Sequence, residues 1–308
     1  MLGTTSTTAT ALKQYWVDMF IENLYDSFAL KGLTKMAKVS KNSGTTVWWV
    51  GIGKVDPAGA ASSEGADPTA RSSRASRVSG VLTEYVNLIK NSKLFSDTAI
   101  DGTKEAIIKD LAKDAAITLD TVLYTKALAG GTVLYANGKA ARNSIAKADT
   151  ATVRDIRKAV NLLQKSGVPT WPDGYYVGLV HADVGFDIQS DSAWVDINKY
   201  RDSVKNDISG EIGRLYGVRF ALAPAMTATN NFLINSGSAS RDVYRTLIFG
   251  PDFLGQADLG EVDIVINEPG KTSELGQFNT YGYRFVSSSA VLTNSRCVRL
   301  ESSASLGS

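Results

Sequence analysis

The residues best suited to catalysis lie around His181, the only histidine of the chain. An apolar stretch, 175–180, precedes it, and Asp183 follows it two residues later. A histidine beside a carboxylate is a typical general base, but it also needs a nucleophile or a metal ion. The chain has no G-x-S-x-G motif, and a hydrolase that uses His181 and Asp183 is kept only as an alternative. We expect His181 to end a strand and to cap or hydrogen-bond the turn that follows.

The aspartates of this segment are regularly spaced. Asp183, Asp187 and Asp191 lie four residues apart, so they share one face of any helix that forms here. Three like charges in a row repel one another, and a bound cation would relieve that repulsion. A solvated face opposite Val184 and Ile188 accounts for the same spacing without a ligand. We therefore predict no metal site.

The charge balance of the chain is close to even. Its 33 lysines and arginines against 31 acidic residues give a net charge of +2. A protein whose main task is to grip nucleic acid usually carries a clear basic excess, so direct DNA recognition is not predicted. The single cysteine, Cys297, excludes an intrachain disulfide and a zinc site built on paired cysteines. We expect it to be a small buried side chain on a strand.

The sequence carries no cofactor signature. GIGK at 51–54 lacks the G-x-x-x-x-G-K-[ST] spacing of a phosphate loop, and no G-x-G-x-x-G motif follows a strand. The N-terminal residues lack a basic segment followed by an apolar core, and no apolar run reaches about 18 residues. We therefore predict no cofactor, no signal peptide and no membrane association, with folding in a cytoplasm.

Apolar periodicity predicts the helices. Over 103–129, apolar residues recur every three or four positions, with the charged residues largely off that stripe. Thr152 and Asp155 form a capping box that begins a second helix, over 153–166. A shorter helix is expected around 182–190.

Strands are predicted where β-branched and aromatic residues gather between turn residues. Trp48 and Trp49 point to opposite faces of the first strand, so both of its faces are predicted to be covered. The segment 210–224 is interpreted as a turn that enters a strand. Helices and strands mix without a regular βαβ repeat, which gives an α+β fold. The predicted strands cover 45–52, 81–89, 175–181, 242–250, 262–269 and 281–302, the last with a tight turn at 293–295.

Two segments offer more surface than a monomer buries alone. Near the N-terminus an amphipathic helix carries an aromatic stripe, which packs on its own domain or reaches a neighbouring subunit. The segment 53–80 has almost nothing to bury, with acidic residues in its first half and arginines in its second. It is interpreted as a flexible loop or as an arm that lies across another subunit. The candidate contact residues are Tyr15, Trp16, Phe20, Glu64, Asp67, Arg71, Arg74 and Arg77.

Seven segments together resemble a family of major capsid proteins from tailed bacteriophages, in the same order over nearly the whole chain. They are ALKQYWVDMFIENLYDSFALKGL, KNSGTTVWWVGIGKV with the loop after it, TVRDIRKAVNLLQKSGVP, DGYYVGLVHADVGFDIQSDSAWVD, GEIGRLYGVRF, DVYRTLIFG and YGYRFVSSSAVLTNSRCVRLES. Each segment alone is a weak signal, whereas seven in register are specific.

The resemblance implies the Hong Kong 97-type capsid fold, with a long spine helix and a loop that extends over the neighbouring subunit. The implied divisions are an N-terminal arm (1–42), an extended-loop region (43–96), the spine helix and peripheral domain (97–149), an axial domain (150–262) and return strands of the peripheral domain (263–308).

The function that the resemblance implies is a major capsid protein, without enzymatic activity. It would assemble as hexamers and pentamers into an icosahedral head around double-stranded DNA, without sequence specificity. Further implied partners are a scaffolding protein, a portal and a decoration protein. The implied location is the virion, with assembly in the bacterial host cytoplasm. An alternative with the same fold is the shell of an encapsulin-like bacterial compartment.

Overall fold

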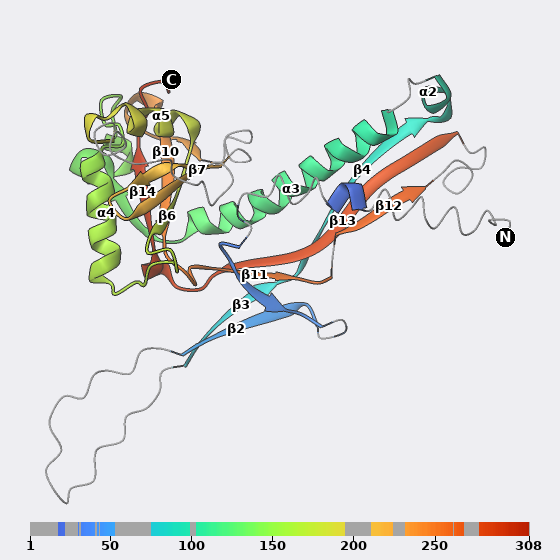
Figure 1. The fold of residues 1–308 in the computed structure, drawn as a ribbon, viewed down its shortest axis with the longest axis horizontal. Coiled ribbons are helices and arrows are strands. Elements are labelled where there is room, and N and C mark those ends of the chain that lie inside the picture. Colours follow the sequence, from blue (N-terminus) through green and yellow to red (C-terminus); the bar gives the residue numbers. More distant parts are fainter. Residues whose placement is uncertain are drawn as a thin grey trace, which may run out of the picture.

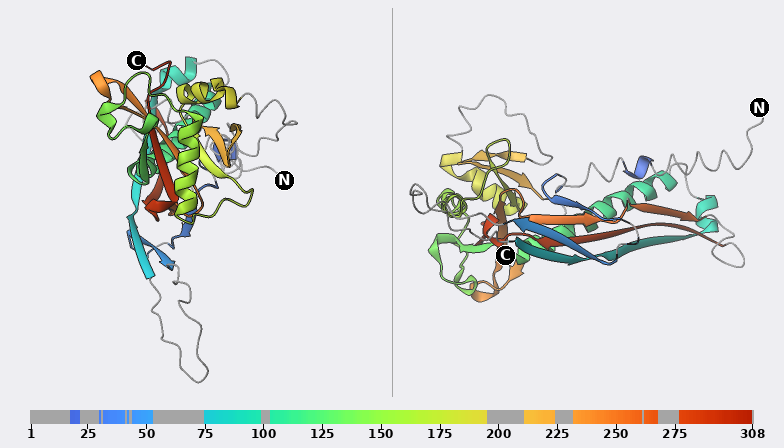
Figure 2. Two further views of the ribbon diagram at one scale, coloured as in Figure 1. Left: turned by 90° about the vertical axis from the view of Figure 1, so that its left-hand side faces the viewer. Right: turned by 90° about the horizontal axis from the view of Figure 1, so that it is seen from below.

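The computed structural model describes residues 18–21, 30, 32–40, 42, 44–52, 75–98, 103–194, 211–223, 232–260, 262–267 and 277–307. Figure 1 shows a compact part, built around a mixed sheet, and an elongated part, in which α3 (Thr103–Ala129) lies along β13 (Phe278–Val291). A hairpin of two strands projects away from both parts, as the two further views in Figure 2 also show.

Helix α3 connects the two parts because its buried stripe continues along its whole length. Ile108, in its first half, packs on the aromatic face of β13, and Leu123, in its second half, packs on the compact sheet. The helix ends before Gly131, whose φ of +85° is a conformation that glycine adopts without a steric penalty. The helix predicted over 103–129 is confirmed. No helix in the described ranges is long and apolar enough to cross a membrane.

The elongated part contains a sheet of five strands. The strand order is β1-β11-β13-β12, and β4 pairs with the other edge of β13 over ten residues. Alternate residues of β13, among them Tyr281, Tyr283 and Phe285, face α3 and are buried. Its strands besides β13 are β1 (Lys35–Lys38), β4 (Thr83–Ser92), β11 (Leu254–Asp258) and β12 (Asp263–Asn267).

The compact part is a sheet with helices on both faces. The order is β5-β14-β10-β6-β8-β7, and β9 pairs with β10. Helices α4 (Val153–Lys165) and α5 (Ala182–Ser190) cover one face, and the C-terminal half of α3 covers the other. Its strands are β5 (Thr132–Tyr135), β6 (Tyr176–Val180), β7 (Glu211–Leu215), β8 (Val218–Leu222), β9 (Leu233–Asn235), β10 (Asp242–Phe249) and β14 (Cys297–Ser302).

The projecting hairpin consists of β2 (Thr46–Ile52) and β3 (Ala75–Val81), paired antiparallel from Thr46–Val81 to Ile52–Ala75. Trp49 joins it to the body, because the indole ring lies against two glycines. A Cβ atom at Gly80 or at Gly255 would come within 2.9 Å of that ring. Because neither glycine has a side chain, the Trp49 ring fits between the hairpin and the body and attaches the one to the other.

Most of the predicted elements are confirmed, and the misses are short. Helix α4 begins after Thr152, whose hydroxyl accepts from the Asp155 amide, as the capping box predicts. The segment 210–224 contains a strand on each side of its turn, where only the second was predicted. Strands β1, β3, β5, β9 and β11 were not predicted, nor was helix α2 (Lys93–Thr98); β3 lies almost entirely in the segment 53–80, which was interpreted as a loop or an arm. Short 3-10 helices cover Ala136–Gly138, Arg142–Ser144, Ser238–Ser240 and Asn294–Arg296.

Candidate functional site

His181 is a helix cap. It directly follows β6, and its Nδ1 accepts a hydrogen bond of 3.2 Å from the Asp183 amide at the start of α5. Burial lowers the pKa of His181, and the nearby Asp183 carboxylate only partly offsets this. That carboxylate also accepts a hydrogen bond of 2.8 Å from the Tyr244 hydroxyl. The prediction that His181 caps the turn after its strand is confirmed, and Nδ1 is occupied in that role.

The three aspartates on α5 and its C-cap hold local structure. The Asp187 carboxylate accepts from the amide and hydroxyl of Ser305, and Asp191 Oδ1 accepts from the Ala193 amide at 2.9 Å. Within the described ranges, no three histidine, cysteine or acidic side chains are grouped as metal ligands would be. On the opposite face Val184 and Ile188 are buried, as predicted.

Cys297 is buried at the start of β14, where the prediction placed it. Burial raises the pKa of its thiol well above the ordinary value, and the attraction of Arg299 only partly opposes that shift. A thiol that stays protonated and out of contact with water is a packing group, because the thiolate is the reactive form.

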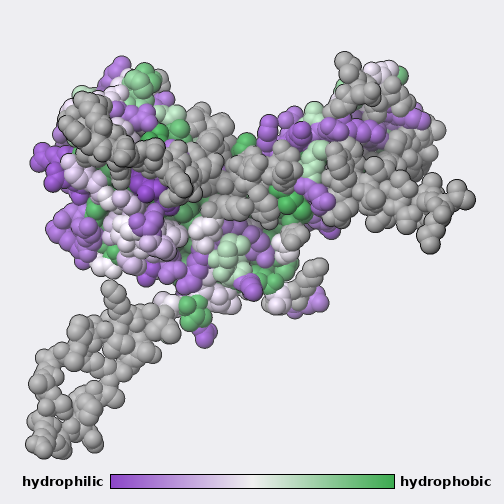
Figure 3. All heavy atoms as spheres, in the orientation of Figure 1, coloured by the Kyte–Doolittle hydropathy of each residue, from purple (hydrophilic) through white to green (hydrophobic). Residues whose placement is uncertain are grey.

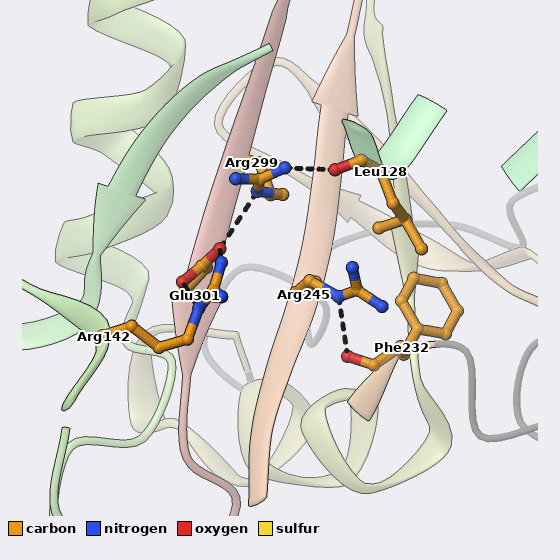
Figure 4. A network of polar contacts seen from close by, with 6 residues as sticks. All are labelled: Leu128, Arg142, Phe232, Arg245, Arg299 and Glu301. Atoms are coloured by element: carbon orange, nitrogen blue, oxygen red, sulfur yellow. Dashed lines mark hydrogen bonds and ion pairs between the residues drawn. The ribbon is translucent and has the colours of Figure 1, made fainter. Parts of the chain in front are cut away.

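The compact part contains a charged cluster that the sequence did not reveal (Figure 4). Glu301 on β14 is fully buried and accepts two hydrogen bonds of 2.6 Å from Arg142. Its Oε1 lies 3.0 Å from Nε of Arg299, which also donates to the Leu128 carbonyl. Three arginines therefore surround one carboxylate, since Arg245 lies opposite Glu301 across the strand pair.

Arg245, on β10, is the third arginine of the cluster. It donates a hydrogen bond of 3.4 Å to the Phe232 carbonyl, and Glu301 is its cross-strand neighbour. Burial lowers the pKa of Arg245 to about 10, and repulsion from Arg299 and Arg142 adds to this while Glu301 opposes it. At neutral pH the guanidinium is still charged, so the cluster is a structural ion network.

The first exposed apolar surface among the described residues is the outer face of the hairpin. Trp48 is 57% exposed, and Val50 and Val81 on the same face are also exposed. The prediction that both faces of this strand are covered is therefore wrong for the chain by itself. Only the Trp49 face is buried. Arg77, a predicted contact residue, lies opposite Val50 on the exposed face.

The second such surface is the face of the elongated sheet that points away from α3. Leu88, Gly282 and Val265 are direct neighbours across β4, β13 and β12, and Leu88 and Val265 are exposed. A Cβ atom on Gly282 would come within 2.9 Å of Leu88, so the glycine lets Leu88 lie flat across the sheet. We call this surface the open sheet face.

Polar residues border the open sheet face. Next to the apolar row, Arg284 pairs with Asp263 at 2.8 Å, and both side chains are more than half exposed. Val86 on β4 is also exposed and is the cross-strand neighbour of Arg284 on β13. An apolar centre with a charged rim is the usual composition of a protein interface. In Figure 3 apolar surface is visible on the projecting hairpin, whereas the compact part near α4 is mostly hydrophilic.

Of the remaining predicted contact residues, only Phe20 lies within the described part of the chain. Phe20 is fully buried in its own chain, where its ring lies 6.2 Å from that of Tyr283. For this one residue the packing is within the domain, as one of the two interpretations of the N-terminal helix expected. The other predicted contact residues lie outside the described residues: Tyr15, Trp16, Glu64, Asp67, Arg71 and Arg74.

Comparison with solved structures gives the fold. The chain is similar to the capsid of Ralstonia phage GP4, with 13% identity, a TM-score of 0.70 and coverage of 90% of this chain and 92% of that one. It is similar to the cyanophage Pam1 capsid, with 13% identity, a TM-score of 0.68 and 92% coverage of both chains. A virus-like particle from Pyrococcus furiosus has 10% identity, a TM-score of 0.56 and coverage of 93% and 98%.

These similarities extend over nearly the whole chain. No family model and no curated protein matches the sequence. The chain therefore has the Hong Kong 97-type fold of tailed-phage capsid proteins, and the predicted α+β class is confirmed.

Proposed function

We propose that this chain is the major capsid protein of a tailed bacteriophage, which assembles as hexamers and pentamers into an icosahedral head around double-stranded DNA. The observation that carries the proposal is the similarity of fold to phage capsids over about 90% of both chains. The role is structural, and no enzymatic activity is part of the proposal. Its location is the virion, after assembly in the host cytoplasm.

The two exposed apolar surfaces support self-assembly. The hairpin face around Trp48 and the open sheet face around Leu88 are both exposed in the described part of the chain. Fully burying one Leu-sized side chain stabilises a contact by about 1.5–3 kcal/mol. Small gains repeated in every subunit favour a closed lattice over free chains. Within this proposal Arg77 and the other predicted contact residues, except the buried Phe20, lie at subunit boundaries.

The division of the chain forms part of the proposal. The arm (1–42) and the extended-loop region (43–96) would contact neighbours, and the axial domain (150–262) would surround the centres of hexamers and pentamers. The spine and peripheral segments (97–149 and 263–308) would form the wall between them. A scaffolding protein, a portal and a decoration protein are proposed partners, and packaged DNA is a partner without sequence specificity.

A second candidate is the shell of an encapsulin-like compartment. The similarity to the Pyrococcus furiosus particle favours it, although at a lower TM-score than the phage capsids. The two candidates differ in what the particle contains. Particles purified from the natural source would hold double-stranded DNA in the first case and a protein cargo in the second, which absorbance and gel analysis distinguish.

Assembly tests the proposal directly. We expect sedimentation velocity and negative-stain microscopy to detect rings or closed shells when the chain is expressed alone or with neighbouring phage genes. Trp48→Ser and Leu88→Ser should reduce the shell fraction while the melting temperature of the free chain stays nearly constant, because both side chains are exposed. Trp48→Phe and Leu88→Met, which keep the apolar surface, should assemble like the wild type. A monomer or dimer under every condition would refute the proposal.

A further inference from the structure

Positive charge is concentrated in one short segment of this nearly neutral chain. The segment 130–170 contains seven of the 33 lysines and arginines and two of the 31 acidic residues. It therefore carries a net charge of +5, and the rest of the chain carries −3. Both acidic residues, Asp149 and Asp155, are buried. The basic residues of this segment for which no ion pair is seen among the described residues are Lys147, Arg154, Arg157 and Lys165.

Three of these basic residues lie along one exposed face of helix α4. Positions 154, 157, 161 and 165 follow the three- and four-residue steps of one helix face. Arg154, Arg157 and Lys165 on that stripe are exposed, while the opposite side of the helix is buried against the compact sheet. At about 1.5 Å per residue, the stripe from 154 to 165 is roughly 16 Å long. We call it the α4 basic stripe.

The α4 basic stripe borders an open groove of about 750 Å³. Asn161 and Gln164 also line the groove, and none of the described residues that line it is acidic. The guanidinium of Arg157 lies over the ring of Tyr216, 5.0 Å from its centroid. Such stacking holds the planar group in place while leaving its edge free to donate hydrogen bonds.

The ion pairs within the segment 130–170 do not neutralise this stripe. Lys158 is bound to Asp155 at 3.0 Å, and Lys139 is bound to Asp149 at 3.3 Å. These two pairs use both carboxylates of the segment. The charges of Arg154, Arg157 and Lys165 are therefore not matched by any acidic residue in the segment that carries them.

We propose that the α4 basic stripe binds the phosphate backbone of duplex DNA. The three cationic side chains of the stripe can each neutralise one phosphate, and the amide side chains of Asn161 and Gln164 can donate hydrogen bonds beside them. Contacts of this kind fix DNA against a surface without reading its sequence. The inference rests on the proposed shell, because DNA is what that shell would enclose, and it assigns the α4 side of the compact part to the inner wall.

The test measures binding of the unassembled chain to a fluorescent mixed-sequence duplex of about 30 base pairs, by anisotropy over a salt series. Each phosphate contact contributes about −0.9 to the slope of log K against log salt concentration. The triple variant R154Q/R157Q/K165Q should therefore bind with a slope shallower by about 2.7 than the wild type. Glutamine keeps a high helix propensity, and circular dichroism checks that α4 stays folded.

A matched control separates the site from net charge. K104Q/K109Q/K113Q removes three exposed lysines from α3, where acidic residues alternate with them. We expect the control to keep the wild-type slope. An equal loss in both variants, or no loss in the α4 variant, would overturn the proposal. Displacement of the duplex by poly-L-glutamate at matched charge, as effective as displacement by unlabelled DNA, would assign the stripe to an acidic polypeptide instead. The α4 variant should still form shells, so this inference and the shell proposal can fail separately.

Discussion

Replacing Glu301 by glutamine removes one buried charge from the three-arginine cluster and changes little else. The side chain is fully buried, accepts both hydrogen bonds of Arg142 at 2.6 Å and lies 3.0 Å from Arg299. Glutamine keeps the size of the side chain, but its amide nitrogen can only donate. One Arg142 donor would then face another donor, and the guanidinium groups of Arg142 and Arg299 would lose the carboxylate that they contact.

The expected cost follows from burial. Removing one partner of a buried ion pair destabilises a protein by about 3–5 kcal/mol, because the remaining charge has neither water nor a partner. Arg142 retains partial access to water, with 31% of its side chain exposed, so the lower half of that range is expected. At about 2 °C per kcal/mol for a chain of this size, the melting temperature of the free subunit should fall by roughly 6–8 °C.

The assay is thermal unfolding of unassembled subunits at neutral pH, with Asp263→Asn as the matched control. Asp263 also forms an ion pair with an arginine, Arg284, but both side chains are more than half exposed. Exposed pairs contribute about 0–1 kcal/mol and are screened by salt. We therefore expect a shift of at most about 2 °C for the control, decreasing further in high salt.

The comparison of the two variants decides the argument. If Glu301→Gln unfolds within about 2 °C of the wild type, as Asp263→Asn is expected to do, burial does not determine the cost of losing the carboxylate. The cluster would then be sufficiently hydrated for water to replace Glu301. A large shift that disappears in high salt would lead to the same conclusion, since buried pairs are screened much less than exposed ones.

Two further predictions concern the hairpin and the acid sensitivity of the chain. Gly80→Ala should destabilise the attachment of the hairpin by about 1–3 kcal/mol, because its Cβ would lie 2.9 Å from the Trp49 ring. Limited proteolysis should then show faster cleavage in the hairpin. Unchanged cleavage would contradict the role of Gly80 in holding the Trp49 ring. Burial favours a raised pKa for Asp149, but hydrogen bonds from Ala146, Asn137 and Lys139 outweigh it and lower the pKa. The ionised Asp149 carboxylate therefore stabilises the folded chain above about pH 4, and this stabilisation is lost as the pH falls through the folded-state pKa. Asp149→Asn should unfold at a lower temperature than the wild type at neutral pH, and the difference should narrow in acid. A difference that stays constant with pH would contradict this.

The elements that could be predicted are those whose signals are local. The helix over 103–129 shows three- and four-residue periodicity for 27 residues, and α4 begins with a capping box that the structure reproduces. His181 was correctly interpreted as a cap because an apolar strand and a helical pattern meet at that residue. Each of these predictions needed only neighbours within a few positions.

The elements that were missed depend on partners far away in the sequence. Strand β1 is only four residues long and mostly exposed, and it forms by parallel pairing with β11, where Lys35 lies beside Gly255. The cluster around Glu301 brings together arginines from 142, 245 and 299, a combination that no local pattern indicates. Alternation placed Trp48 and Trp49 on opposite faces correctly, but it could not reveal that only one face is covered by the same chain.

The two sheets of the chain differ in how far each is covered, and this difference connects the fold with assembly. The compact sheet has helices on both faces, whereas the elongated sheet has α3 on one face and exposes Leu88 and Val265 on the other. An exposed apolar sheet face generally indicates an interface. In a head-to-tail contact, one surface of a subunit is covered by a different surface of the next subunit. The last subunit of an open chain therefore keeps one of the two surfaces uncovered, unless the rotation between subunits closes the chain into a ring. In the proposed shell, a closed ring would therefore cover the open sheet face of every copy.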